Sequence, residues 1–379
     1  MAHSGSEIQP ENDEERLERE HFHKVLRAFS HYKKHAIERV SKSQTDFHAL
    51  PERHRKMLPD FLPQLGKIRT CIDHNYEVLK LIIEQADDIF ENKAHGPATD
   101  SDLHMPVSTF DLDKVKTTLR QFVRDWSEDG RYERDQSYTP IIEEIQKLFP
   151  GDQCNVREVS VLVPGAGLGR LAFEIARRGY MCQGNEISLY MLFGSNFILN
   201  RSYGVNYLTI YPWVHNFCNN KSKEDQIRPV HIPDTDPSTL PTSALFSMAA
   251  GDFLEVYKDP DSWDCVATSY FIDTGHNILA YIETIYNILK PGGYWVNLGP
   301  LLYHFSDIAH ESSIELSYDV VKRIIKDFGF EIVKENQAMP STYTHNQKNM
   351  LKYEYSCIFI VCRKPERPHS NGTLDYESS

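Results

Sequence analysis

The segment Val161-Leu-Val-Pro-Gly-Ala-Gly-Leu-Gly-Arg170 joins a short β-branched run to a helical pattern. Residues 159–163 predict a buried strand, and residues 170–178 predict a helix. The three glycines between them suit a sharp turn, because glycine accepts positive φ and lets a ligand approach the backbone. A glycine-rich loop alone is a weak signal, so its surroundings must decide the interpretation.

Six further strand candidates follow this segment, with helical patterns between most of them. They span residues 181–185, 245–249, 263–269, 294–298, 330–334 and 355–362. Strands that alternate with helices form mostly parallel sheets, because each crossover helix returns the chain to the same edge. The sequence therefore predicts an α/β fold with a doubly wound sheet.

The first 150 residues carry helical patterns instead. Apolar residues recur at helical spacing over residues 14–34, 67–90 and 111–126. Residues 203–241 are rich in Asn, Pro and charge, and we expect an insertion that lies over one end of the sheet. The predicted organisation is a disordered acidic N-terminus, a helical region, an α/β domain and a disordered tail, at residues 1–20, 21–150, 151–365 and 366–379.

Composition narrows the classes of partner. The 379 residues are 40% apolar and include 19 Phe and 20 Tyr, which is enough for a substantial core. The formal charge of −13 disfavours a nucleic-acid partner, since such binding depends on neutralising phosphates with Lys and Arg. We therefore expect no folded RNA or DNA partner.

Membrane and metal signals are weak. No run approaches the roughly 20 apolar residues that span a bilayer, and the N-terminus is polar and acidic, so we expect a soluble intracellular protein without a membrane partner. The seven cysteines are an odd number with no CxxC pair. We interpret them as reduced core residues and expect no metal site.

An acidic residue lies at the spacing that a nucleoside site requires. Glu186 ends the next strand candidate, 21 residues after Gly165, where a carboxylate can accept both ribose hydroxyls of an adenosine. Nicotinamide and S-adenosylmethionine sites share this spacing. Arg170 stands where the dinucleotide fingerprint has glycine, so a methyltransferase loop fits better. The alternative is a tight turn beside a solvent-exposed Glu.

Later strand ends supply further polar groups. Asp252 and Phe253 follow the third strand candidate, where they could bind an adenine amino group and ring, although a plain Gly-Asp turn would look the same. The run Leu289-Lys-Pro-Gly-Gly before a strand recurs in class I methyltransferases, which this order of elements resembles. The alignment of strands then puts Asp273 at the carboxyl end of the fourth strand, facing the ligand crevice.

A more specific resemblance covers roughly residues 111–362. The chain resembles the carnosine N-methyltransferase family, whose pattern it matches at residues 124–127, 163–171, 184–188, 251–253, 271–274 and 299–304. Most class I methyltransferases carry an acid two residues before the first loop glycine. Val163 stands there in this chain, which departs from that superfamily but agrees with the family.

The resemblance implies a reaction and its participants. It implies transfer of a methyl group from S-adenosylmethionine to an imidazole nitrogen of carnosine (β-alanyl-histidine), giving anserine and S-adenosylhomocysteine, with related His-containing dipeptides as further substrates. It also implies a homodimer in the cytosol and nucleus. The implied cofactor-binding residues are Gln121, Arg124, Gly165, Glu186, Asp252, Phe253 and Ser269. The implied substrate-binding residues are Asp273, His304, Tyr343, Tyr353 and Tyr355, with Asp273 and His304 also catalytic.

In this family the helical N-terminal region closes over the cofactor, and Arg124 suits the methionine carboxylate because guanidinium and carboxylate form bidentate pairs. The alternative is a surface arginine paired with Asp125 or Glu128. Tyr353 and Tyr355 would share one strand face by their spacing of two. Core aromatics would give the same pattern.

The chemistry needs a neutral imidazole nitrogen held in line with the methyl group. Our hypothesis is that Asp273 accepts a hydrogen bond from the substrate imidazole N–H, which leaves the other nitrogen free and stabilises the developing positive charge. His304 would assist in positioning. A lone His after an apolar run is otherwise a structural residue as often as a functional one.

Three competing functions stay open. The same core could methylate His within peptides or proteins, with residues 203–241 as the docking surface. A catalytically silent methyltransferase fold could serve as an interaction module, although the retained cofactor groups argue against it. A nicotinamide dehydrogenase is disfavoured by Arg170 and by the absence of an evident hydride-transfer constellation.

Overall fold

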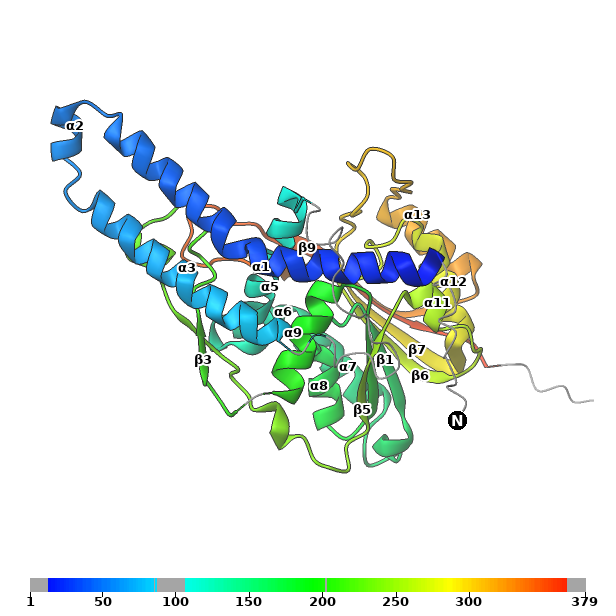
Figure 1. Cartoon of the computed structure of the whole chain (residues 1–379). Coiled ribbons are helices and arrows are strands. Elements are labelled where there is room, and N and C mark those ends of the chain that lie inside the picture. Colours follow the sequence, from blue (N-terminus) through cyan, green and yellow to red (C-terminus); the bar gives the residue numbers. More distant parts are fainter. Residues whose placement is uncertain (1–12, 85, 87–105, 202, 367–379) are drawn as a thin grey trace, which may run out of the picture. The chain divides into compact units, whose positions relative to one another are not determined.

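A computed structural model describes residues 13–84, 86, 106–201 and 203–366 (Figure 1). By contacts the chain forms two compact units, each assembled from separate segments. The first comprises residues 1–132, 188–239 and 343–353, and the second comprises residues 133–187, 240–342 and 354–379. This division differs from the linear boundary expected at residue 150, because the insertion and a late loop pack with the N-terminal helices.

The structure describes only some of the residues that we expected to be disordered. Residues 1–12 and 367–379 lie outside the described residues. Residues 13–20 were expected to be disordered, and this was wrong, since the first helix begins at Asp13. Arg16 pairs with Asp13 and Glu20 at distances of 3.5 and 2.7 Å, and ion pairs three and four residues apart stabilise a helix end.

Helices dominate the first unit. Its elements are α1 (Asp13–His48), α2 (Glu52–Lys56), α3 (Phe61–Ile83), α5 (Thr109–Trp126), η2 (Glu128–Gly130), α9 (Leu189–Asn200), β3 (Leu208–Ile210), α10 (Lys223–Gln226), β4 (Val230–Ile232) and η4 (Pro237–Thr239). In Figure 1, α1 and α3 run side by side and connect through α2. The apolar face of α1 continues past its predicted end through Ala36 and Val40, which are buried, and this explains the longer helix.

Helix α5 is fixed firmly at its start. Ser108 and Asp111 form a capping box, in which the serine hydroxyl accepts the Asp111 N–H. Asp111 is 3% exposed. Its carboxylate also accepts a hydrogen bond from the hydroxyl of Tyr190 on α9 and forms an ion pair with Lys24 of α1. One buried carboxylate thus joins three helices.

The insertion is more ordered than its sequence indicated. Strands β3 and β4 pair antiparallel, and Asn75 of α3 exchanges hydrogen bonds with the backbone of Tyr211. Asn75 also donates to the hydroxyl of Tyr32, which lies 2.8 Å from His215 Nε2. Burial lowers the pKa of His215 to about 3, so this ring is neutral. The insertion is therefore bonded to the helical hairpin.

The second unit is built around a seven-stranded sheet. Its strands are β1 (Ser160–Pro164), β2 (Met181–Glu186), β5 (Phe246–Ala250), β6 (Trp263–Ser269), β7 (Leu289–Gly299), β8 (Glu331–Ser341) and β9 (Tyr355–Arg363). Its helices are α6 (Arg131–Ser137, which starts two residues before the unit), α7 (Thr139–Leu148), η3 (Val156–Glu158), α8 (Arg170–Arg177), α11 (Phe253–Val256), α12 (Ile278–Ile288) and α13 (Tyr318–Asp327). All seven predicted strands are present.

The strand order is β5-β2-β1-β6-β7-β9-β8. The first five strands are parallel, whereas β9 runs antiparallel to both β7 and β8. The order reverses between β1 and β6, which makes this the topological switch point where doubly wound sheets bind ligands. The doubly wound α/β prediction is confirmed.

Both faces of the central strand β1 are buried. Val161 and Val163 of β1 pack with Ile175 of α8, whereas Leu162 packs with Ile282 of α12 on the opposite face. Side chains alternate between faces along a strand, so a strand covered on both sides is apolar throughout. This explains why β1 was recognisable as a continuous β-branched run.

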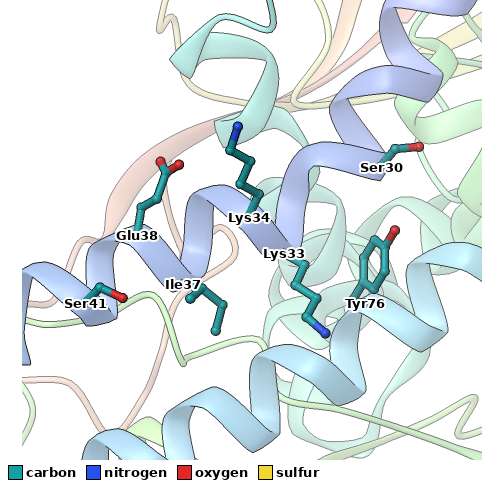
Figure 2. A pocket seen from close by; sticks show the side chains of 7 residues that line it. All are labelled: Ser30, Lys33, Lys34, Ile37, Glu38, Ser41 and Tyr76. Atoms are coloured by element: carbon teal, nitrogen blue, oxygen red, sulfur yellow. The ribbon is translucent and has the colours of Figure 1, made fainter.

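A surface hollow of about 590 Å³ lies along α1 and α3 (Figure 2). Its lining residues are Ser30, Lys33, Lys34, Ile37, Glu38, Ser41 and Tyr76. Lys33 pairs with Asp73 at 2.9 Å, and both side chains are about half exposed. An exposed ion pair of this kind contributes little energy. The polar side chains that line the hollow are exposed or half-buried, so none of them is a buried group that could recognise a ligand.

No helix among the described residues has both the length and the apolar character needed to cross a bilayer. Within the same ranges, no group of three or more His, Cys, Asp or Glu side chains could hold a metal ion. The seven cysteines are free, and five are buried, but Cys218 is exposed and therefore is not the core residue we expected.

Adding a methyl group at two glycines of the first unit should change the stability of the protein in opposite directions. A Cβ on Gly130 would lie 2.1 Å from the carbonyl oxygen of Val123, whereas a Cβ on Gly66 would meet nothing within 4 Å. We expect Gly130→Ala to reduce the free energy of unfolding by at least about 1–3 kcal/mol. We expect Gly66→Ala, in an exposed helix interior, to raise it by about 0.5–1 kcal/mol.

Urea unfolding followed by circular dichroism would measure both changes. The Gly66→Ala protein serves as the matched control for adding one methyl group. Equal stabilities of the two variants would contradict this account of the end of α5.

Candidate active site

The glycine loop after β1 has the geometry that the sequence predicted. Gly165, Gly167 and Gly169 have φ of 65°, 56° and 81°, in the left-handed region where residues with a Cβ are strained. A Cβ on Gly165 would also lie 2.5 Å from Cδ2 of Phe271, which follows β6. The loop therefore needs glycine both for its conformation and for its close approach to the neighbouring strand.

Glu186 ends β2 beside this loop. Its side chain is buried, and its two carboxylate oxygens accept the N–H groups of Gly167 and Ile187, each at 2.9 Å. The alternative of a solvent-exposed Glu is therefore wrong. Each carboxylate oxygen has about two acceptor positions, so the group can still accept ribose hydroxyls.

Asp252 and Phe253 begin α11 after β5. Asp252 caps this helix by accepting the N–H of Leu254 at 2.7 Å, so it does have the local turn role that we kept as the alternative. Phe253 is 3% exposed and packs edge-on against Phe271 and Tyr281. Burial raises the pKa of Tyr281, and the nearby charges of Asp252 and Glu186 raise it further. Tyr281 of α12 is thus a site residue that the sequence did not reveal.

Ser269 supplies a polar atom without a partner. It is the last residue of β6, and its buried hydroxyl oxygen has no hydrogen-bond partner among the described residues. Buried polar groups are nearly always bonded, so an exception beside a glycine loop indicates a ligand contact. Together with the buried Glu186 carboxylate, it fits a cofactor that carries an adenosine.

Asp273 lies in the turn after β6 and is 3% exposed. Its Oδ2 accepts the N–H of Leu302 at 2.6 Å, and its backbone oxygen accepts the N–H of His304 at 3.2 Å. Burial raises the pKa of Asp273 to about 6, although the Leu302 hydrogen bond opposes this change. The carboxyl group is therefore a proton acceptor poised near neutral pH.

His304 follows β7 and meets the Asp273 turn through its backbone. Its side chain keeps exposed surface, yet desolvation by surrounding protein lowers its pKa, so the ring is neutral at physiological pH. The structure thus brings together the two residues predicted to be catalytic. A neutral imidazole can donate or accept a hydrogen bond to a substrate, depending on its tautomer.

Tyr355 is the first residue of β9 and lies against Tyr270, with ring centroids 6.0 Å apart. Tyr270, between Ser269 and Phe271, has φ of 54°, which is strained for a bulky residue. Its hydroxyl oxygen accepts a hydrogen bond from the Cys357 thiol. Strained backbone concentrates at functional sites, and no sequence signal marked Tyr270.

The first unit gathers a separate group of predicted residues. Gln121 and Arg124, both buried on α5, contact Tyr343: Gln121 Nε2 donates to the Tyr343 hydroxyl at 2.5 Å, and the Arg124 guanidinium lies 4.6 Å from the ring centroid. Arg124 also pairs with Asp125 at 3.2 Å, but both are buried, so the alternative of a surface arginine is wrong.

Tyr353 does not have the placement we expected. It is 65% exposed and precedes β9, which begins at Tyr355. It also belongs to the first unit, whereas Tyr355 belongs to the second. The inference that the two tyrosines share a strand face was therefore wrong, because the chain is not extended as a strand before Tyr355.

Comparisons with known proteins agree on one family. The family model described as Carnosine N-methyltransferase matches residues 101–366. A mouse protein named Carnosine N-methyltransferase is 54% identical over 93% of this chain and 88% of its own length. Proteins of the same activity name from Drosophila melanogaster and Schizosaccharomyces pombe are 41% and 40% identical, over 94% and 89% of this chain and 81% and 94% of their own lengths.

Solved structures are more distant. Phosphoethanolamine N-methyltransferase 2 from Haemonchus contortus, in complex with S-adenosyl-L-methionine, is 16% identical over 65% of this chain and 47% of its own, with a TM-score of 0.36. A SAM-dependent methyltransferase from Methanosarcina mazei is 14% identical over 58% of this chain and 99% of its own, with a TM-score of 0.37. Neither likeness is close enough to carry an argument about the site.

The burial of Asp273 has a measurable cost in stability. Because its pKa is about 6 in the folded protein and near 3.8 ordinarily, the folded carboxyl group binds its proton more tightly than the unfolded one. The folded state is therefore destabilised as the pH rises from about 4 to 6, and remains so above that range. Asp273→Asn removes the charge and keeps an oxygen that can accept the Leu302 N–H.

We expect Asp273→Asn to raise the free energy of unfolding by about 1–3 kcal/mol at pH 8, since a tenfold change in proton affinity corresponds to about 1.4 kcal/mol. The difference should shrink as the pH falls towards 4. Chemical denaturation of both proteins across this range measures it. A wild type that is the more stable protein at pH 8 would contradict a desolvated carboxylate.

Proposed function

The chain belongs to the carnosine N-methyltransferase family, and we propose that it transfers a methyl group from S-adenosylmethionine to an imidazole nitrogen of carnosine, giving anserine. The observation that carries this assignment is Asp273, a buried carboxyl group with a pKa of about 6 at the carboxyl end of β6. Such a group can hold an imidazole N–H and accept its proton. The family match over residues 101–366 supports the substrate.

Asp273 controls the tautomer of the substrate in this proposal. Because Oδ2 already accepts the Leu302 N–H, Oδ1 is the oxygen that we assign to the substrate imidazole N–H. That hydrogen bond places the proton on one ring nitrogen and leaves a lone pair on the other. A carbon–nitrogen bond forms there while the sulfur–carbon bond breaks, and its electron pair stays on sulfur. The imidazolium proton then passes to Asp273.

His304 is assigned to orient the substrate. Its lowered pKa keeps the ring neutral, so it adds no positive charge beside the imidazolium that forms in the reaction. The hydrogen bond from its N–H to the Asp273 carbonyl fixes the spacing of the two backbones. Tyr355 is assigned to the same substrate pocket, with Tyr270 as the residue that positions its ring.

The cofactor supplies an electrophilic methyl group on a positively charged sulfur. Glu186 would accept the ribose hydroxyls, and Asp252 and Phe253 would hold the adenine. The buried Ser269 hydroxyl, which has no hydrogen-bond partner among the described residues, and the left-handed backbone of Gly165 support this placement. In the first unit, Arg124 would pair with the methionine carboxylate, and Gln121 would donate to it.

The test is an assay of the purified protein with S-adenosylmethionine and, separately, carnosine, homocarnosine, free histidine and a peptide with internal His. Mass spectrometry reads the methylated products. We expect the two dipeptides to be methylated preferentially. Methylation of the internal-His peptide alone would replace the proposal with a protein methyltransferase, and cofactor binding without any product would favour an interaction module.

Asp273→Asn separates chemistry from binding. We expect kcat to fall by at least about 10²-fold, since general base catalysis contributes 10²–10⁴-fold, while the affinity for S-adenosylhomocysteine by calorimetry stays unchanged. The matched control is Asp307→Asn, which neutralises an exposed carboxylate in the loop after β7 and should stay near wild-type activity. An active Asp273→Asn enzyme would sink the mechanism.

Two expectations from the resemblance stay predictions. We propose a homodimer, which sedimentation of the purified protein would test. We also propose a location in the cytosol and nucleus, which cell fractionation would test. Neither bears on the chemistry assigned to Asp273.

A further inference from the structure

Helix α1 carries two buried polar side chains that the active site described above does not use. Arg27 is 8% exposed, and none of its three guanidinium nitrogens has a hydrogen-bond partner among the described residues. His23, one turn earlier, is 5% exposed, and its Nε2 also has no partner within the same ranges. Buried polar groups are nearly always bonded, so two exceptions one turn apart need a physical explanation.

The two side chains lie away from the packed face of α1. Phe22 and Phe29 of that face pack against Phe193 of α9, with ring centroids 5.5 and 6.1 Å apart. At about 100° per residue, Arg27 lies roughly 140° around the helix from Phe22. Residues four apart on a helix are neighbours, so His23 and Arg27 form a pair on a second face. Packing against α9 therefore does not account for their burial.

The carboxylates that the helices offer nearby are already engaged. Glu20, the acidic residue nearest to the pair along α1, forms an ion pair with Arg16 at 2.7 Å. Asp111 of α5 closes its own capping box and pairs with Lys24. Across the part of the chain that the structure describes, no acidic side chain bonds to Arg27. Its charge is thus not balanced from within these helices.

The chemistry of the pair indicates what would balance this charge. A guanidinium does not lose its proton in a protein, so burial cannot neutralise Arg27. A buried charge without a counter-ion is strongly unfavourable. A carboxylate or phosphate removes this penalty, because a guanidinium donates two parallel N–H bonds to either group. His23 can donate a further hydrogen bond to the same group through Nε2.

We propose that His23 and Arg27 form an oxyanion-binding site on α1, which takes the carboxylate or phosphate group of a small molecule. It adds a second arginine to Arg124, which the proposed function assigns to the methionine carboxylate. Two sources of the oxyanion fit this chemistry: the carboxylate of the dipeptide substrate, and a free anion that acts as an effector. The site itself goes beyond the proposed function, and only the first source depends on it.

Thermal unfolding of the purified full chain tests the site without any turnover. In chloride buffer, Arg27→Leu should raise the unfolding midpoint by about 2–5 °C, because an apolar side chain replaces an unbalanced buried charge. If the source is a free anion, sodium phosphate or sodium citrate at about 10 mM should raise the wild-type midpoint by about 2–5 °C over chloride of equal ionic strength. Arg27→Leu should abolish that response.

The matched control is Lys34→Gln, which removes one positive charge from an exposed position of the same helix. It should leave the midpoint and the response to each anion unchanged. His23→Phe keeps a ring and loses the donor, and we expect it to weaken anion binding on the order of tenfold. Arg27→Gln carries the same test if Arg27→Leu does not fold.

Steady-state kinetics distinguishes the two sources. If the dipeptide supplies the carboxylate, Arg27→Gln should raise the KM for carnosine at least about tenfold. The KM for β-alanylhistamine, which is carnosine without its carboxylate, should then stay within about twofold of wild type. If a free anion is the source, both KM values should stay near wild type while phosphate or citrate shifts the wild-type midpoint.

Two results would overturn the inference. The first is a wild-type midpoint that neither phosphate nor citrate moves, together with an Arg27→Gln enzyme whose KM for carnosine is unchanged. The second is a lower midpoint for Arg27→Leu in chloride, because Arg27 would then have a stabilising partner within the protein. A chain that responds to citrate through Arg27 but methylates neither compound would overturn the proposed function and leave this site standing.

Discussion

The position of β1, paired in parallel with β2 on one side and β6 on the other, is the constraint on which the site depends. Parallel pairing brings the carboxyl ends of these strands to one edge, and the reversal of order at β1 leaves room above that edge. The glycine loop, Glu186 and Ser269 meet there although they are far apart in the sequence. Below the edge, Thr268 donates to Asn297 and accepts from Trp295, which fixes β6 against β7.

Burial sets the chemical character of this edge. Asp273 is desolvated enough to hold a proton near neutral pH, yet one backbone N–H keeps its charged form accessible. Strain is stored beside it, because Tyr270 has a left-handed backbone conformation. Both features oppose folding, and the apolar layers on either side of the sheet must offset them. The site therefore lowers the free energy of unfolding locally, and the packing in the rest of the second unit offsets this loss.

Sequence patterns predicted where the strands lie better than they predicted how the strands pair. β1, β2 and β6 were located to within a residue or so. For β1 the local signal is a buried β-branched run that ends at the glycine loop. β8 was predicted too short, since its polar residues resemble a loop although their backbones pair with β9. Sheet pairing at an edge leaves little trace in composition.

Side-chain contacts between distant segments were beyond prediction. Tyr281 acquires its place among the site carboxylates from the packing of α12, and Tyr343 meets Gln121 across 222 positions of sequence. The resemblance named Tyr343 as a substrate residue, but no sequence signal paired it with Gln121. The insertion gave no sign that it would bond to α3, because Asn75 looks like any polar residue of a helix.

Each of the two units is built from separate segments of the chain, so the time at which a unit can fold depends on when its last segment is synthesised. The helical unit contains residues 13–84, but it is completed only by residues 343–353, which are synthesised later. Domains that occupy one continuous stretch fold as they emerge, whereas this unit must wait until residues 343–353 have been made. The contact between Arg124 and Tyr343 therefore closes late, and a nascent or prematurely terminated chain lacks it.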